Sequence, residues 1–271
     1  NHVHTELITD NLLQEARDWA KLQLFRNADV NVKYCESVEA AIAMCKNGVD
    51  VLELGVPYSD PVMDGLVIQE ATETALANGF KLKQVFEAVK AITAQVDTPV
   101  LVMTYWNPIE KYGVEKFAQS IAANGGSGVI TPDLTIEESA GWKSAVDKSE
   151  INPIYVVAPS TSAQRLPQVT SRCGGFVYAA SLMGVTGTRT AVSSGAPDLV
   201  ARIRETTDLP IAVGLGVSTR EQAKGVAGYA DGVIVGSAFI KAMQDAPNEA
   251  EGLKSVKELA QQLSLGVREG R

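Results

Sequence analysis

Three carboxylates lie within a stretch of twelve residues, and one of them occupies a position where a charge is unfavourable. Glu53 interrupts the apolar run 51-VLELG, whereas Asp60 and Asp64 follow it in 56-VPYSDPVMDG. A carboxyl in an apolar wall at the end of a strand has a raised pKa and can hold a proton near neutrality. A carboxyl on a more exposed loop stays ionised and can accept one. Together, Glu53 and Asp64 could therefore give and take protons in one turnover.

The same carboxylates also allow a purely structural interpretation. Glu53 would then be a buried carboxylate paired with a Lys or Arg, and Asp60 and Asp64 would shape the turn. The spacing D-x-x-x-D-G lacks the alternating oxygen ligands of a calcium loop, and no metal site is expected. Because the only histidines are His2 and His4, Ser-His-Asp chemistry and histidine-ligated zinc are excluded for the body of the chain. The general acids and bases of any active site here must therefore be carboxylates, Tyr or Lys.

Three segments late in the chain combine glycines with small residues directly after apolar runs: 184-GVTG, 214-GLGVS and 235-VGSAF. Glycine lets backbone N–H groups approach an anion, and Ser237 at the start of a helix adds a donor at a positive dipole end. Tight packing of strands against helices would explain each glycine separately. Their recurrence after consecutive strands favours a phosphate site, which barrels commonly hold at this place. We expect a phosphorylated substrate.

Short apolar runs that alternate with helical segments must position these residues. The runs read 51-VLELG, 100-VLVMTYW, 128-GVITPDL, 154-IYVVAP, 175-GFVYAAS, 211-IAVGLG and 232-GVIVGS. Helical periodicity marks the segments 36–48, 83–96, 113–126 and 197–207. Capping-box spacing predicts helix starts from Thr135 to Glu138 and from Ser218 to Glu221. Runs this continuously apolar are typical of parallel strands covered on both faces, so the sheet is either doubly wound or closed.

Closure into a (β/α)8 TIM barrel requires an eighth strand, and 22-LQLF is the only candidate. The preceding helix, with its apolar positions from Leu7 to Trp19, would plug the bottom of the barrel. No linker or shift in composition interrupts the chain, so residues 1–271 are expected to form a single barrel domain with an extra N-terminal helix. The gap between residues 55 and 100 leaves room for a long loop at the face where barrel active sites lie.

The composition limits the partners and the compartment. The chain has 24 basic and 32 acidic side chains and a formal net charge of −8, with no block of Lys or Arg. Nucleic acid and an anionic membrane are therefore not expected partners. Cys35, Cys45 and Cys173 form no C-x-x-C pair, which indicates a reducing compartment. No stretch approaches a membrane span and none resembles a signal peptide, so a soluble cytoplasmic protein is expected.

Together these motifs resemble the α subunit family of tryptophan synthase. The resemblance rests on LELGVPYSDPVMDG, VMTYWNPIEKYG, TPDLTIEES, VVAPS, GFVYAASLMGVTGTR, VGLGVST and DGVIVGSAF, in order over residues 37–265. It implies a (β/α)8 barrel that cleaves indole-3-glycerol phosphate to indole and glyceraldehyde 3-phosphate in tryptophan biosynthesis. It also implies an α2β2 assembly with a β subunit that carries pyridoxal phosphate, and no cofactor in this chain.

The resemblance also assigns roles to residues. Asp64 would accept or stabilise the indole N–H, while Glu53 would protonate indole C3 and take the proton of the glycerol hydroxyl. The phosphate-binding positions would be Gly187, Gly216, Gly236 and Ser237. The positions around the indole pocket would be Tyr178, Tyr105, Met103 and Thr186, with Phe25 on the first strand. The positions of the partner-facing or closing loops would be Asp60, Pro61 and Asp133.

The chain departs from the family pattern in three places. Residues 1–36 diverge, and 21-KLQLFRNADVNVKY has neither the glycine nor the proline that shape the turn after the first strand. Leu66 and Thr135 stand where the family has prolines, and losing rigid φ angles should loosen the loops that hold the aspartates. Two alternatives therefore accompany the lyase. One is a catalytically impaired barrel that binds and modulates a β subunit, and the other is a different phosphosugar lyase or isomerase.

Overall fold

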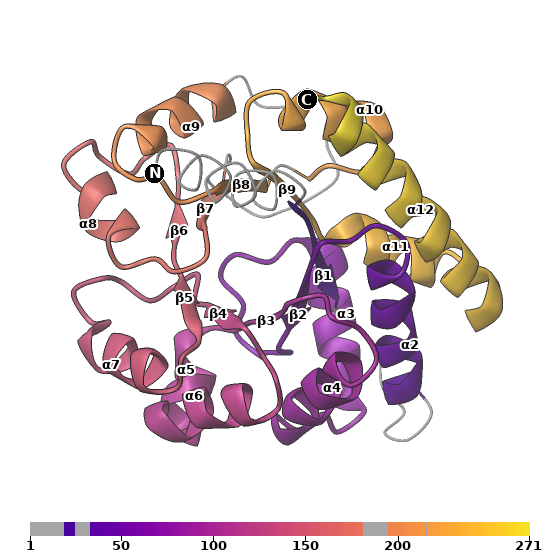
Figure 1. Cartoon of the computed structure of the whole chain (residues 1–271). Helices are drawn as coiled ribbons and strands as arrows, with labels where there is room; N and C mark the ends of the chain where they lie inside the picture. The colour runs from indigo at the N-terminus through magenta and orange to yellow at the C-terminus, as the bar shows by residue number, and fades with distance from the viewer. Residues whose placement is uncertain (1–18, 25–32, 181–194, 215) are drawn as a thin grey trace, which may run out of the picture.

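The computed structural model describes residues 19–24, 33–180, 195–214 and 216–271, and these form a ring of parallel strands inside a ring of helices (Figure 1). The strands are β1 (Trp19–Leu24), β2 (Val51–Gly55), β3 (Val100–Met103), β4 (Gly128–Ile130), β5 (Asn152–Ile154), β6 (Val156–Val157), β7 (Val177–Ala180), β8 (Ile211–Gly214) and β9 (Gly232–Val235). Their order in the sheet is β5-β4-β3-β2-β1-β9-β8-β7-β6. Because Tyr155 alone separates β5 from β6, the two ends of this order meet and the sheet closes. The predicted barrel is confirmed.

Helices of the described residues surround the sheet. They are α2 (Lys33–Cys45), α3 (Leu66–Ala77), α4 (Lys83–Thr93), α5 (Trp106–Tyr112), α6 (Val114–Ala123), α7 (Ala140–Lys148), α8 (Leu166–Thr170), α9 (Ala196–Arg204), α10 (Arg220–Ala227), α11 (Ser237–Gln244) and α12 (Glu249–Glu269). The long gap after β2 holds the loop of residues 56–65 followed by α3 and α4. The expected room for a loop at this face is therefore present, although two helices fill most of the gap.

Strand β1 is the element that the sequence indicated most weakly. It pairs in parallel with β2 on one side (Lys21↔Val51) and with β9 on the other (Trp19↔Gly232). Backbone hydrogen bonds to strands on both sides stabilise it without a strong local pattern. Trp19, which we expected in the N-terminal helix, is instead the first residue of β1. The remainder of that predicted helix lies outside the described residues, as does Phe25.

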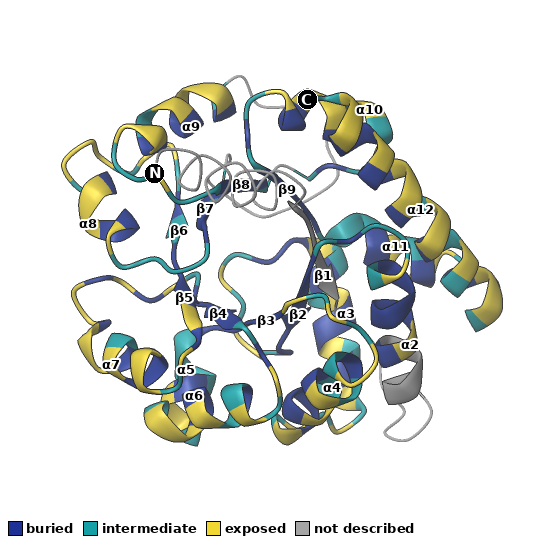
Figure 2. Ribbon diagram, in the orientation of Figure 1, coloured by how far each residue is buried: buried dark blue, intermediate teal, exposed yellow. Residues whose placement is uncertain are grey.

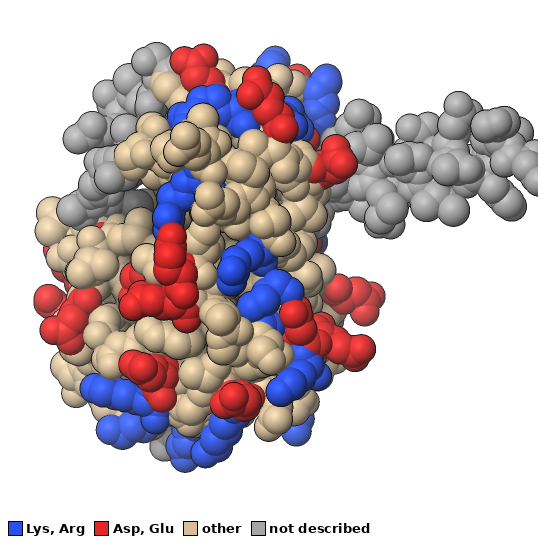
Figure 3. Space-filling model, turned by 90° about the vertical axis from the view of Figure 1, so that its left-hand side faces the viewer, with Lys and Arg blue, Asp and Glu red and all other residues tan. Residues whose placement is uncertain are grey.

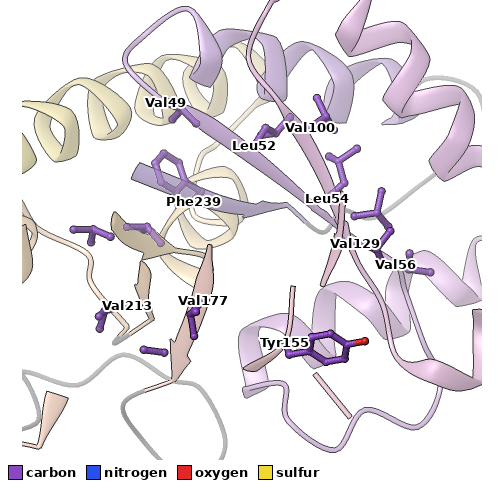
Figure 4. Close-up of a cluster of buried hydrophobic side chains, with 14 of the residues drawn as sticks. Val49, Leu52, Leu54, Val56, Val100, Val129, Tyr155, Val177, Val213 and Phe239 are labelled. Atoms are coloured by element: carbon purple, nitrogen blue, oxygen red, sulfur yellow. The ribbon is translucent and has the colours of Figure 1, made fainter. Parts of the chain in front are cut away.

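The side chains of the strands alternate between two apolar layers. Every second strand residue points toward the helices and packs with their buried side chains in one large core. Figure 4 labels ten residues of this core: Val49, Leu52, Leu54, Val56, Val100, Val129, Tyr155, Val177, Val213 and Phe239. The other set packs inside the barrel as a separate cluster of Val51, Leu101, Ile130, Ile154, Phe176, Ala212 and Ile234. Figure 2 shows the same division, with buried residues on the strands and on the inner sides of the helices. Strands covered on both faces explain the continuously apolar runs.

The two predicted capping boxes have different outcomes. Before α10 the box is formed by Thr219 and Gln222, one residue later than the predicted pair Ser218 and Glu221. The side chain of Gln222 also accepts from the backbone N–H of Ser218 at 2.8 Å, so an amide at this position holds two residues of the turn. Thr135 does donate to Glu138 at 3.2 Å, but no α-helix starts there, because α7 begins at Ala140.

The surface carries both signs of charge. On the face around α7, α8 and α9, acidic and basic side chains are interspersed (Figure 3). Two of the pairs are Arg165 with Glu137 at 2.7 Å and Lys143 with Asp147 at 2.5 Å. This face therefore offers no continuous basic surface for nucleic acid. Among the described helices, none is both long enough and apolar enough to cross a membrane.

Candidate active site

Glu53 lies in the middle of β2 and is completely buried. Its neighbours in register are Gln23 on β1 and Leu101 on β3. Because side chains along a strand alternate, Glu53 points to the same side as Val51, into the barrel, two residues nearer the carboxyl end of the strand. The predicted burial of this carboxyl is confirmed, although Glu53 is the third residue of β2 and does not end the strand.

Asp64 lies at the end of the loop 56–65, just before Gly65 caps α3. We expected this side chain to be more exposed than Glu53 and to remain ionised, but only 9% of its surface is exposed. The loop folds back over the strands: the N–H of Val56 donates to the carbonyl of Met103 at 2.9 Å. At the other end of the loop, the side chain of Gln69 donates to the backbone carbonyl of Asp64 at 2.7 Å. Burial raises the pKa of Asp64 to about 6, against the opposing effect of a hydrogen bond with Tyr105.

Two tyrosines predicted for the indole pocket lie beside the carboxylates. Tyr105 follows β3 and is 5% exposed, and its hydroxyl accepts from the backbone N–H of Met63 at 3.0 Å. Tyr178 is on β7, and the pKa of its hydroxyl is raised by burial first and then by the negative charges of Glu53 and Asp64. The third described member, Met103, packs against the inner cluster together with Tyr178. The structure thus brings both carboxylates and three predicted pocket residues to one end of the barrel.

Gly214, at the end of β8, leaves space for the Tyr178 side chain. A Cβ built on Gly214 would lie 2.9 Å from the Tyr178 hydroxyl oxygen and 3.1 Å from a ring carbon. Such a contact is too close for a carbon atom, so any side chain at position 214 would displace the tyrosine. The glycine in 214-GLGVS therefore has a packing role beside the carboxylates.

The predicted phosphate-binding residues are described in part. Gly216 has a φ of +67°, in the left-handed region that favours glycine. Gly236 is the N-cap of α11, and Ser237 is the first residue of that helix. Strands β8 and β9 are paired neighbours, so the segments that follow them begin side by side at the carboxyl end of the barrel. Gly187 and Thr186 lie outside the described residues.

The residues predicted to face a partner have distinct environments. Asp60 is exposed and accepts from the Ser59 hydroxyl at 2.5 Å. Next to the partly buried Pro61, Val62 is 73% exposed, and Leu66 is 71% exposed. Asp133 accepts from the backbone N–H of Trp106 at 2.9 and 3.1 Å and so stabilises the start of α5. The loop therefore presents an apolar surface beside a carboxylate, whereas Asp133 holds the segment that follows Tyr105.

Sequence reasoning missed a second layer of residues that support the loop. The ring of Tyr58 packs on that of Tyr105, with 5.3 Å between the ring centroids, and its hydroxyl accepts from the side chain of Asn107 at 3.0 Å. The aromatic residue between Pro57 and Ser59 was visible in the loop motif. Its partner lies 49 residues further along the chain, and no local spacing connects the two.

The arrangement suits proton transfer by carboxylates. Within the described part of the chain, no group of three or more His, Cys, Asp or Glu side chains could hold a metal ion. Two buried carboxylates beside tyrosine hydroxyls can exchange protons with a substrate held at the mouth of the barrel. The glycine-rich ends of β8 and β9 can supply backbone donors to an anionic group on that substrate.

Comparison with known proteins decides the family. The family model described as tryptophan synthase alpha chain matches residues 29–268. The chain belongs to this family. The tryptophan synthase alpha chain of Streptomyces coelicolor is 53% identical over 231 residues, which is 85% of this chain and 85% of that protein. The lyase class predicted from the sequence is confirmed, and the match does not support a different phosphosugar lyase or isomerase.

Solved structures of the family have the same fold. A structure of Mycobacterium tuberculosis tryptophan synthase aligns with a TM-score of 0.86 and 42% identity, over 95% of this chain and 96% of that one. A structure from the tryptophan synthase α2β2 complex of Pyrococcus furiosus aligns with a TM-score of 0.81 and 31% identity, over 91% and 98% of the chains. The family match begins at residue 29 and therefore includes the last part of the divergent segment 1–36.

Proposed function

We propose that this chain cleaves indole-3-glycerol phosphate to indole and glyceraldehyde 3-phosphate with Glu53 and Asp64 as its acid–base pair. The observation that carries the assignment is the burial of both carboxylates at one end of the barrel. Glu53 points inward from β2, Asp64 lies on the loop that folds over it, and both influence the hydroxyl of Tyr178. Family membership supplies the reaction, and the burial of the two carboxylates supports their assignment to it.

The proton movements follow from the two positions. Glu53, in its protonated form, donates its proton to indole C3, while Asp64 accepts a hydrogen bond from the indole N–H and stabilises the positive charge on the ring. The Glu53 carboxylate then takes the proton of the adjacent glycerol hydroxyl. The hydroxyl becomes the aldehyde carbonyl, and the electrons of the broken C–C bond restore the aromatic indole. Glu53 is protonated again, so the cycle needs no cofactor in this chain.

The binding residues surround this pair. The indole ring would lie against Tyr105, Tyr178 and Met103, and the family resemblance adds Phe25 and Thr186 to the proposed pocket. The phosphate would bind to the backbone around Gly216 and Gly236, to Ser237 at the positive end of α11, and to Gly187. Tight positioning matters, because displacement of a reacting group by 1 Å can reduce the rate by about 100-fold.

A β subunit is the proposed partner. The Pyrococcus furiosus structure, which is 31% identical to this chain, concerns the mutual activation of the tryptophan synthase α2β2 complex. The loop with Asp60 and Pro61 adjoins the exposed side chains of Val62 and Leu66, which would be covered in such an assembly. Asp133, which accepts from the backbone N–H of Trp106, would link the contact with the β subunit to the start of α5. Pyridoxal phosphate would then belong to the β subunit, and the α2β2 enzyme would work in the cytoplasm.

The test is the release of indole from indole-3-glycerol phosphate by the purified full chain, alone and with a β subunit. Glu53→Gln and Asp64→Asn should each reduce turnover by about 100- to 10,000-fold, the range that general acid–base catalysis contributes. Glu70→Gln makes the same change of carboxylate to amide at an exposed position of α3 and should keep the parental turnover.

Two results would contradict the assignment. Full turnover in either carboxylate variant would remove that residue from the proton transfers. A folded parental chain that releases no indole in either condition, yet alters the activity of the β subunit, would instead establish the impaired modulating barrel that the substitutions at Leu66 and Thr135 suggest.

A further inference from the structure

The hydroxyl of Tyr105 contacts two consecutive residues of the loop 56–65. It accepts from the backbone N–H of Met63 at 3.0 Å and forms a hydrogen bond with the carboxyl group of Asp64. A tyrosine hydroxyl has one proton and can also accept. Because Met63 supplies the donor to the oxygen, the hydroxyl proton is free to point toward Asp64. The direction of the second bond is therefore from Tyr105 to the carboxylate.

The position of Tyr105 is itself fixed from several sides. It is 5% exposed and occupies the N-cap of α5, two residues after the end of β3. The next residue, Trp106, donates its backbone N–H to both oxygens of Asp133 at 2.9 and 3.1 Å. The ring of Tyr58 packs on the ring of Tyr105. The hydroxyl is thus presented to the loop by the rigid end of a barrel strand.

We propose that Tyr105 is a positioning residue, whose hydroxyl holds Asp64 as an ionised acceptor oriented toward the substrate. This inference rests on the proposed role of Asp64 and adds a function to a residue so far assigned only to the pocket wall. A hydrogen bond donated to a carboxylate favours its charged form, whereas burial favours the neutral form. Tyr105 therefore opposes the burial that closure of the loop imposes on Asp64.

The charged and titratable groups around Asp64 come from several elements. The pKa of Tyr178, on β7, is raised first by burial and then by the charges of Glu53 and Asp64. The pKa of Tyr105 is likewise raised first by burial and then by the charge of Asp64. Asp133, from the loop after β4, also raises the pKa of Tyr105. Both tyrosines accordingly keep their protons over the working pH range, and Tyr105 remains a donor. Asp64, with a pKa of about 6, is the carboxyl group of this cluster that titrates near neutrality.

The chain offers a matched control for the loss of this hydroxyl. Tyr58 belongs to the same stacked pair, but its hydroxyl accepts from Asn107 at 3.0 Å. Tyr58→Phe and Tyr105→Phe each remove one hydroxyl from the pair and keep both rings. Only the second variant removes the bonds to Met63 and Asp64.

The experiment is the pH profile of kcat/KM for indole release between pH 5 and 9, for the full chain with a saturating β subunit. The parental acid limb should lie near pH 6, the pKa of Asp64. In Tyr105→Phe it should move up by about one pH unit, which lowers kcat/KM by about five-fold at pH 6 and by less than about 1.5-fold at pH 8. In Tyr58→Phe the limb should stay in place.

The outcomes separate this inference from the proposed function. An unmoved acid limb in Tyr105→Phe, or a loss that is equal at all pH values, would overturn the positioning role and leave Tyr105 as pocket wall. An acid limb that moves equally in Tyr58→Phe would assign the effect to the stacked pair and would also overturn it. Full activity in Asp64→Asn would instead overturn the proposed function, whatever the behaviour of the tyrosine variants.

Discussion

The two ends of the barrel interior differ although the same strands build both. Inside the barrel, inner side chains form one apolar cluster, which includes Val51 at the start of β2 and Phe176 just before β7. Two residues further along the chain from Val51 and Phe176 lie Glu53 and Tyr178. Side chains on one face of a strand recur at every second residue, so the next inward-facing residue after an apolar one is here a carboxylic acid or a tyrosine. Stability and chemistry thus lie in adjacent layers, as in barrels generally.

Glu53 and Tyr178 form an upper layer of the barrel interior, and their positions depend on the apolar cluster, the lower layer. The lower layer is filled by side chains from consecutive strands, so it fixes the strand positions from which Glu53 and Tyr178 project. The upper layer needs an additional loop, because the strands alone supply only part of the site. Asp64 reaches this layer through hydrogen bonds of the loop to Met103 and Tyr105.

The largest expected effect comes from opening the apolar layer. Phe176→Ala should lower the free energy of unfolding by about 3–5 kcal/mol, because a buried aromatic ring is removed and a cavity remains. The cost should not vary between pH 5 and 8, since no titratable group is changed. Urea denaturation measures it. Phe176→Leu, which keeps more apolar volume, should cost clearly less, and equal costs for the two variants would contradict a packed layer.

A smaller effect of opposite sign is expected in the upper layer. Burial raises the pKa of Asp64 to about 6 in the folded chain, from an ordinary value of 3.8. Between these two pH values, Asp64 is already ionised in the unfolded chain but still protonated in the folded chain. The free energy of unfolding therefore falls as the pH rises through this range, and the decrease is complete above about pH 6. Asp64→Asn should therefore be more stable than the parent by about 1–2 kcal/mol at pH 8.

That gain should shrink below pH 6 and vanish near pH 4, where Asp64 is protonated in both states. Urea denaturation of the parent and the variant across this range gives the difference directly. A gain that is independent of pH would mean that the substitution acts through packing, and that burial of the charge is not its cause.

The smallest effect is expected outside the barrel interior, at the start of α3. Gly65 has φ −78° and ψ 167°, a conformation that accepts a following proline, and Leu66 is the first residue of the helix. Leu66→Pro should raise the free energy of unfolding by about 0.4–1 kcal/mol, through fewer conformations of the unfolded chain. Leu66→Ala should stay within about 0.5 kcal/mol of the parent. A loss of stability in the proline variant would show that the helix start needs the Leu66 N–H.

The sequence by itself determined the alternation of parallel strands with helices and the burial of Glu53, and its motifs indicated the barrel through their resemblance to the family. Continuous apolar runs separated by helical periods reflect local backbone preferences, and the loop motif and its glycines are contiguous in the chain. Local patterns of this kind can be recognised without knowing which residues are in contact. The weakest strand, β1, lacked a local pattern because its stability comes from pairing with β2 and β9 on either side.

Only the tertiary structure decided the environment of Asp64 and what supports it. The aspartate looked exposed in a Pro- and Gly-rich loop, yet it is buried because that loop folds over the barrel and bonds to Tyr105 after β3. The shift of the capping box to Thr219 and the contact between Tyr58 and Asn107 likewise depend on the exact path of the backbone. Burial and hydrogen bonding are properties of residues brought together from distant positions, and no local spacing specifies them.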